Sequence, residues 1–123
     1  MHRAIIVAAA GIAATLLVHA PAHAAGFDCA RATRTDEVTI CRTPSLSALD
    51  SEMSGLWYAY SRVPMLMGGN GDRGDEARAF LARRAACRAN IACLTAAYRA
   101  RIEALHRGID GAMDEYQRMQ NEG

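Results

Sequence analysis

The sequence predicts an all-α protein, a small disulfide-stabilised helical domain of three to four helices. Apolar residues recur at steps of three and four along alanine-rich segments, which is the spacing of one helix face. Runs of alternating or β-branched residues that would indicate strands are nearly absent. The four cysteines stand in two short-range pairs behind an export leader, so they are expected to form disulfides and not a metal site.

Residues 1–24 have the composition of a secretory signal peptide. Met1-His2-Arg3 is a short positive start, residues 4–18 are almost wholly apolar, and Ala22-His23-Ala24 is a small-x-small cleavage site before Ala25. The apolar run is shorter than the ~20 residues that a membrane-spanning helix needs. We therefore expect cleavage, a periplasmic or secreted location, and no stable membrane insertion afterwards. An uncleaved anchor is the alternative.

The mature chain, residues 25–123, is long enough for a single domain. The full chain has 14 basic and 13 acidic residues, every basic one is an arginine, and Arg3 leaves with the leader. Nucleic-acid binding and polybasic attachment to a membrane surface both need an excess of positive charge. The balanced charge of the mature chain therefore argues against both classes of partner.

Two helices are expected in the first half of the mature chain. Thr35-Asp36-Glu37 supplies a hydroxyl cap and first-turn acids for a short helix that leads to Cys41. Thr43-Pro44 then opens a longer helix, because proline suits the first helical position. This helix should end near Val63-Pro64. Its apolar face consists of Leu46, Leu49, Met53, Leu56, Trp57 and Tyr60.

A glycine-rich segment, Gly68–Gly74, predicts a mobile loop before the second half. A third helix is expected from about Asp75 to near Cys87, and a fourth from near Ile91, running as far as Met119. Gly108 and Gly111 weaken the fourth helix by up to ~1 kcal/mol each. The third helix should have Ala77, Phe80, Leu81 and Arg84 on one side; the fourth should have Leu94, Tyr98, Ile102, Leu105 and Ile109.

The four cysteines permit three disulfide connectivities. Local bridges, Cys29 with Cys41 and Cys87 with Cys93, would each contribute roughly 2–3 kcal/mol, and a crossed pairing about 4 kcal/mol, so energetics leave the choice open. The position of Cys87 and Cys93 at a helix-to-helix joint favours the local pairs. The sequence has no C-x-x-C spacing of the kind that zinc sites use.

No catalytic, metal-binding or cofactor-binding pattern stands out in the mature chain. Its one histidine, His106, has no serine or cysteine partner in a recognisable arrangement. The glycine-rich segment lacks the lysine of a phosphate-binding loop. We therefore expect no cofactor and no enzymatic activity.

Two cysteine-centred segments together resemble the LprI-type lysozyme-inhibitor domain. The first is Phe27-Asp28-Cys29-Ala30-Arg31-Ala32 with Glu37, Ile40-Cys41 and Leu46-Ser47-Ala48-Leu49-Asp50. The second is Arg84, Cys87, Cys93-Leu94, Tyr98 and Arg101-Ile102 with Leu105. The likeness covers about residues 27–105 and leaves residues 106–119 as a C-terminal helical extension. The chain differs from the family pattern at Ala77, Phe80 and Ala85.

The resemblance implies a helical, disulfide-bonded domain of the bacterial cell envelope that binds a protein partner and inhibits lysozyme. The alternatives are a non-catalytic envelope stress or structural protein, or an immunity-like partner of another toxin. Fold follows from such a likeness more directly than function does. The oligomeric state is left open.

Four charged residues in these segments are expected to hold helices together: Glu37, Asp50, Arg84 and Arg101. Charges beside cysteines and apolar residues become half-buried and then need opposite partners. Glu37 or Asp50 should pair with Arg84 or Arg101. The competing interpretation is an exposed recognition patch.

The candidates for partner binding are Met65, Leu66, Met67 and Arg73. Methionine-rich surfaces adapt readily to partners, and an arginine on a projecting loop could pair with the carboxyl groups of a lysozyme cleft. A solvated connector, or a cap on the helical core, is the alternative for this segment.

Overall fold

The computed structural model describes residues 25–65 and 69–122, and every regular element in these ranges is helical. The elements are a 3-10 helix, η1 (Cys29–Arg31), and four α-helices: α1 (Thr35–Arg42), α2 (Pro44–Tyr60), α3 (Gly69–Cys87) and α4 (Ile91–Asn121). The all-α prediction is confirmed. The expected leader, residues 1–24, and Leu66 and Met67 lie outside the described residues.

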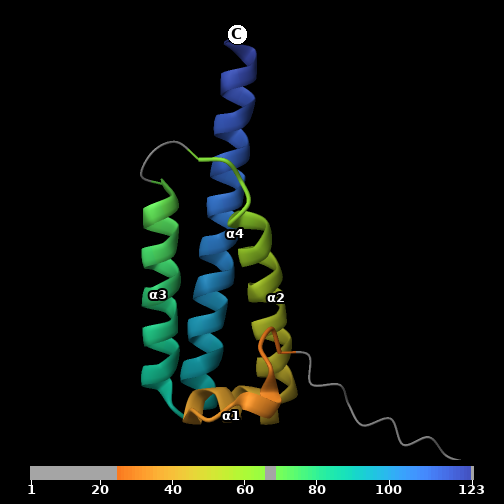
Figure 1. Ribbon diagram of the computed structural model, residues 1–123, viewed down its shortest axis with the longest axis vertical. Coiled ribbons are helices and arrows are strands. Elements are labelled where there is room, and N and C mark those ends of the chain that lie inside the picture. Colours follow the sequence, from red (N-terminus) through yellow and green to blue (C-terminus); the bar gives the residue numbers. More distant parts are fainter. Residues whose placement is uncertain (1–24, 66–68, 123) are drawn as a thin grey trace, which may run out of the picture.

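The three long helices lie side by side, and α1 crosses one end of them (Figure 1). Helix α4 packs against both α2 and α3, so it is the central helix of the bundle. Helix α1 contacts α2 and α3 and closes this end. The polar residues of the first half are thereby brought beside the ends of α3 and α4.

Local sequence explains where the helices begin. In α1 the Glu37 side chain accepts a hydrogen bond from the Arg34 backbone N–H at 3.3 Å, which satisfies a donor that the helix leaves unpaired. Helix α2 begins at Pro44, as predicted. Helix α4 is capped by Asn90, whose side chain accepts from the Cys93 N–H at 3.0 Å.

The core lies where α1 closes the bundle. Phe80 of α3 and Tyr98 of α4 are almost fully buried and meet edge to face, with ring centroids 5.3 Å apart. Ile40, Leu46, Leu94 and Cys87 surround them. Leu81, expected on the inner side of α3, is 48% exposed instead, because Phe80, Arg84 and Cys87, at steps of four and three residues, form the buried face of this part of the helix.

Both disulfides are local. Cys29 is bonded to Cys41, which ties η1 to α1, and Cys87 is bonded to Cys93, which ties the end of α3 to the start of α4. These are the pairs preferred from the sequence. The α3–α4 turn between the second pair includes Arg88 with a φ of 52°. Two disulfides are typical of proteins that fold outside the reducing cytoplasm.

Helix α3 begins earlier than predicted, and the expected loop is wrong over Gly69–Gly74, which is helical. Arg73 is the physical reason. Its guanidinium is buried and donates to the backbone carbonyls of Tyr60 and, at 3.0 Å, of Val63. Tyr60 is the last residue of α2, and its carbonyl also accepts from the Val63 N–H at 3.2 Å, so Arg73 adds a second donor at this helix end. The tertiary contact therefore outweighs the poor helix propensity of glycine.

Helix α4 extends well beyond the ends of α2 and α3 (Figure 1). At 31 residues it is about 46 Å long, against about 26 Å for the 17 residues of α2. Gly108 lies where α4 passes the end of α2, and a Cβ there would meet Tyr60 Cζ at 2.7 Å. Glycine thus weakens the helix but permits this close approach. None of the described helices combines the length and the apolar character needed to cross a membrane.

Candidate functional site

A buried polar network occupies the closed end of the bundle, and Arg84 of α3 is its centre. The guanidinium donates through Nε to Asp36 Oδ2 at 2.9 Å. Its other nitrogens lie 3.6 Å from Glu37 Oε1 and 3.8 Å from Asp50 Oδ1. One arginine of α3 therefore holds carboxylates of α1 and α2, and the ring of Phe27 lies 5.5 Å from its Cζ.

Asp50 extends this network to α4 and to the start of the described chain. Its Oδ1 accepts a hydrogen bond from the Tyr98 hydroxyl at 2.6 Å, and its Oδ2 accepts one from the Gly26 N–H at 2.6 Å. The aspartate is only 1% exposed. A buried carboxylate needs such donors, because water cannot reach it. Asp50 is thus a joint between α2, α4 and the N-terminal segment.

The network shifts the pKa values of its members. Burial of Asp36 by itself raises the pKa of its carboxyl, but the hydrogen bonds and charges of Arg84 and Arg34 outweigh this and hold that pKa below its usual value. Burial opposes the charged form of Arg84, yet Tyr98 and Asp36 raise the pKa of the guanidinium. Burial and the hydrogen bond to Asp50 raise the pKa of the Tyr98 phenol.

These shifts predict a loss of stability at both extremes of pH. Because the folded pKa of Asp36 lies below the unfolded 3.8, its contribution is complete above 3.8 and is lost as the pH falls through the folded pKa. Because the folded pKa of Tyr98 lies above the unfolded 10.0, its contribution is complete below 10.0 and is lost as the pH rises further. Urea midpoints across the pH range measure this dependence. Asp36→Asn should reduce the fall of the urea midpoint at acid pH and leave the fall at alkaline pH unchanged. An unchanged fall at acid pH would show that Asp36 is not the group responsible.

The structure brings together most of the predicted polar residues, with different partners for some of them. Arg84 reaches both Glu37 and Asp50, the acids named as candidate partners. Arg101 instead pairs with Glu76 at 3.3 Å and lies over the Trp57 ring, with its Cζ 5.6 Å from the centroid. Of the two candidate arginines, Arg84 and not Arg101 pairs with Glu37 and Asp50, because α4 places Arg101 beside Glu76 of α3.

Three members of the network were not predicted from the sequence: Asp36, Tyr98 and the largely exposed Arg34, which pairs with Asp36 at 3.3 Å. Asp36 was interpreted only as a first-turn acid, yet it makes the shortest ion pair of Arg84. Tyr98 was assigned to an apolar face without a role for its hydroxyl. A tyrosine at a core position of a helix is the available signal, since a buried tyrosine hydroxyl usually finds a partner.

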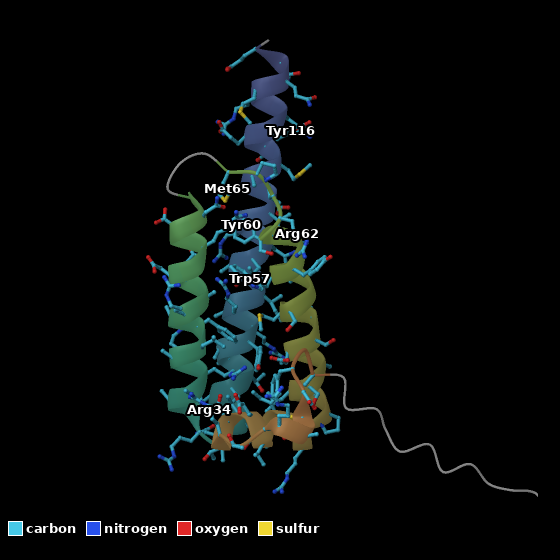
Figure 2. All side chains as sticks on the ribbon, viewed as in Figure 1. Arg34, Trp57, Tyr60, Arg62, Met65 and Tyr116 are labelled. Carbon is cyan, nitrogen blue, oxygen red and sulfur yellow. A yellow bond between two sulfur atoms is a disulfide. The ribbon has the colours of Figure 1, made fainter. Side chains whose placement is uncertain are left out.

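A groove of about 860 Å³ lies at the other end of the bundle. Val63, Pro64, Met65 and Gly69, around the α2–α3 connection, form one wall. The projecting part of α4 forms the other, and Figure 2 shows Tyr116 on it, beyond Met65 and the end of the bundle. The α4 wall consists of Arg107, Gly108, Gly111, Ala112, Met113, Glu115, Tyr116 and Met119.

The groove continues into exposed apolar surface. Met113, Tyr116 and Met119 are each about half exposed, at 47%, 50% and 47%. Arg107 and Glu115 are the charged residues in the lining. Large apolar side chains gathered beside a groove are the usual mark of a binding surface.

The predicted partner-binding residues have different positions relative to this groove. Met65 lines it. Leu66 and Met67 lie outside the described residues. Arg73 is only 5% exposed and is engaged with backbone carbonyls and with Asn70, so it does not project toward a partner as expected. The residues of α4 that line the groove were not predicted as binding residues, because the apolar face predicted for this helix ended at Ile109.

Within the described ranges no cluster of three or more His, Cys, Asp or Glu side chains could hold a metal ion. The chain matches no protein-family model, and no curated protein and no solved structure matches it.

Proposed function

We propose that this chain is an exported protein that acts in the periplasm or outside the cell by binding a protein partner, and that lysozyme is the partner. The likeness of residues 27–105 to the LprI-type domain supports this, as do the leader-like residues 1–24. The two disulfides fit a protein of an oxidising compartment.

The apolar surface at the free end of α4 is the observation that carries the proposal. Tyr116 and Met119 are half exposed beside a groove that Met65 helps to line. Covering such side chains releases water from apolar surface and favours association. A short helix that extends alone into water is also marginally stable, so a partner along it would stabilise it.

The shape of this region suits the blocking of a cleft. A helix with its side chains is about 10–12 Å wide, and the end of α4 stands clear of the bundle. Lysozymes cleave their substrate in a cleft with two carboxyl groups. Among the residues that the structure describes, Arg118 is paired only with Glu115 of the same helix, and both are exposed. Such a surface pair is weak, so Arg118 can exchange it for a carboxylate of the partner.

A lysis assay with lysozymes of several types tests the proposal. We expect the wild-type protein to inhibit at least one type, and Tyr116→Ala/Met119→Ala to weaken inhibition by about tenfold or more, because anchors of this kind contribute most of the binding free energy. The matched control is Tyr58→Ala/Leu81→Ala, which truncates side chains that are 61% and 48% exposed elsewhere on the bundle. Thermal melts should show all three proteins folded.

Two outcomes would count against the proposal. If the Tyr116→Ala/Met119→Ala protein inhibits as well as the wild type, the end of α4 is not the contact surface. If the wild type inhibits no lysozyme, the inhibitor proposal itself fails, and an envelope stress or structural role or a different toxin partner replaces it.

A further inference from the structure

The first described residues are held against the buried network. The Gly26 N–H donates to Asp50 Oδ2 at 2.6 Å, across 24 positions of sequence. Ala25 and Phe27 pack against the hydrophobic core on either side of Gly26. The chain on the mature side of the expected cleavage point is therefore part of the folded domain.

The packing around Gly26 is too close for any other residue. A Cβ at this position would lie 2.0 Å from Ser54 Oγ, 2.6 Å from Ser54 Cβ and 3.2 Å from Asp50 Oδ2. Glycine is the residue that lets the backbone approach this surface of α2. The position of the Gly26 nitrogen limits how far the Ala25 nitrogen can lie from Asp50.

The network that this segment meets carries an excess of negative charge. Its carboxylates are Asp36, Glu37 and Asp50, and its cations are Arg84 and the largely exposed Arg34. Tyr98 is neutral and donates to Asp50. One more cation beside Asp50 would balance the charges.

We propose that Asp50 binds the α-ammonium group that removal of the leader creates at Ala25. Neighbouring backbone nitrogens are at most about 3.6 Å apart, so the Ala25 nitrogen lies within about 6 Å of Asp50 Oδ2. At this range the positive charge of an ammonium attracts the negative charge of a carboxylate. The nearby guanidinium of Arg84 would repel this ammonium, but it approaches the other oxygen of Asp50, Oδ1, at 3.8 Å.

Processing would thereby stabilise the fold. Hydrolysis of the Ala24–Ala25 bond by an envelope peptidase consumes water, leaves a carboxylate on the released leader, and leaves an amine on Ala25 that is protonated at neutral pH. Before cleavage the same nitrogen belongs to an uncharged peptide bond. The inference rests on the exported state proposed above, and not on the identity of the partner.

The absence of lysine makes this directly testable. Since every basic side chain is arginine, the α-amino group is the single amine of the mature protein, and acetylating reagents modify it selectively. The processed protein is produced by export with its own leader. We expect acetylation to reduce its folding equilibrium constant by about fivefold to tenfold, measured by urea unfolding.

Two control proteins isolate the position of the charge. In one, a Gly-Ser extension before Ala25 moves the amine away from Asp50; in the other, Gly26→Ala displaces the segment from Ser54. Acetylation should change the stability of either by less than about twofold. An equally small effect on the processed wild type would overturn the proposal, as would an equal effect on the extended protein. A purified mass that retains residues 1–24 would also overturn it. The lysis assay is independent of all three results.

Discussion

Replacing Arg84 by methionine is expected to lower the free energy of unfolding by about 3–5 kcal/mol. Methionine keeps much of the volume but removes the charge. Asp36 and Asp50, which are 2% and 1% exposed, would then remain buried without the cation that joins them. Removing one partner of a buried ionic network is far more destabilising than removing a surface pair, because the other charges stay desolvated.

Arg83→Met is the matched control, since Arg83 is the neighbouring arginine of α3 and is exposed. It should change stability by no more than about 0.5 kcal/mol. Urea unfolding of both variants at neutral and acid pH makes the comparison. The deficit of Arg84→Met should shrink at acid pH, because protonated carboxyls no longer need a cation. Equal stability of the two variants would show that the network does not hold the helices together.

Phe80→Ala is expected to destabilise the protein by about 3–5 kcal/mol, through the lost burial of the ring and the cavity left behind. Phe80 is 2% exposed, and its ring meets Tyr98 edge to face. The cavity would open beside the tyrosine whose hydroxyl binds Asp50. Loss of core packing should therefore also loosen the polar network.

Leu81→Ala is the adjacent control, at a side chain that is 48% exposed. Its expected effect on thermal or urea unfolding is within about 0.5 kcal/mol. A similar loss from both substitutions would mean that α3 presents a different face to the bundle. Near-ultraviolet circular dichroism should report the altered Tyr98 environment in Phe80→Ala only.

The helices and disulfides could be predicted because their determinants are local. Apolar spacing identified α2 and α4, Pro44 marked the first position of α2, and the helix joint favoured the bond between Cys87 and Cys93. Each of these signals acts over a few neighbouring residues: a helix face repeats every 3.6 residues, and a cap bonds within one turn. The candidate network was partly predicted for the same reason, since Glu37, Asp50 and Arg84 stand near cysteines and apolar residues in the sequence.

Tertiary packing decided the contacts between residues that are far apart in the sequence. Arg84 binds Asp36, and Tyr98 binds Asp50, each across 48 positions of sequence. Arg73 makes a helix of Gly69–Gly74 because its guanidinium finds carbonyls at the end of α2. The sequence shows which polar groups need partners, but which partner each group finds depends on which helix faces pack together. The groove likewise forms because α4 extends beyond the ends of α2 and α3. How much of α4 these two helices cover is decided when the bundle assembles.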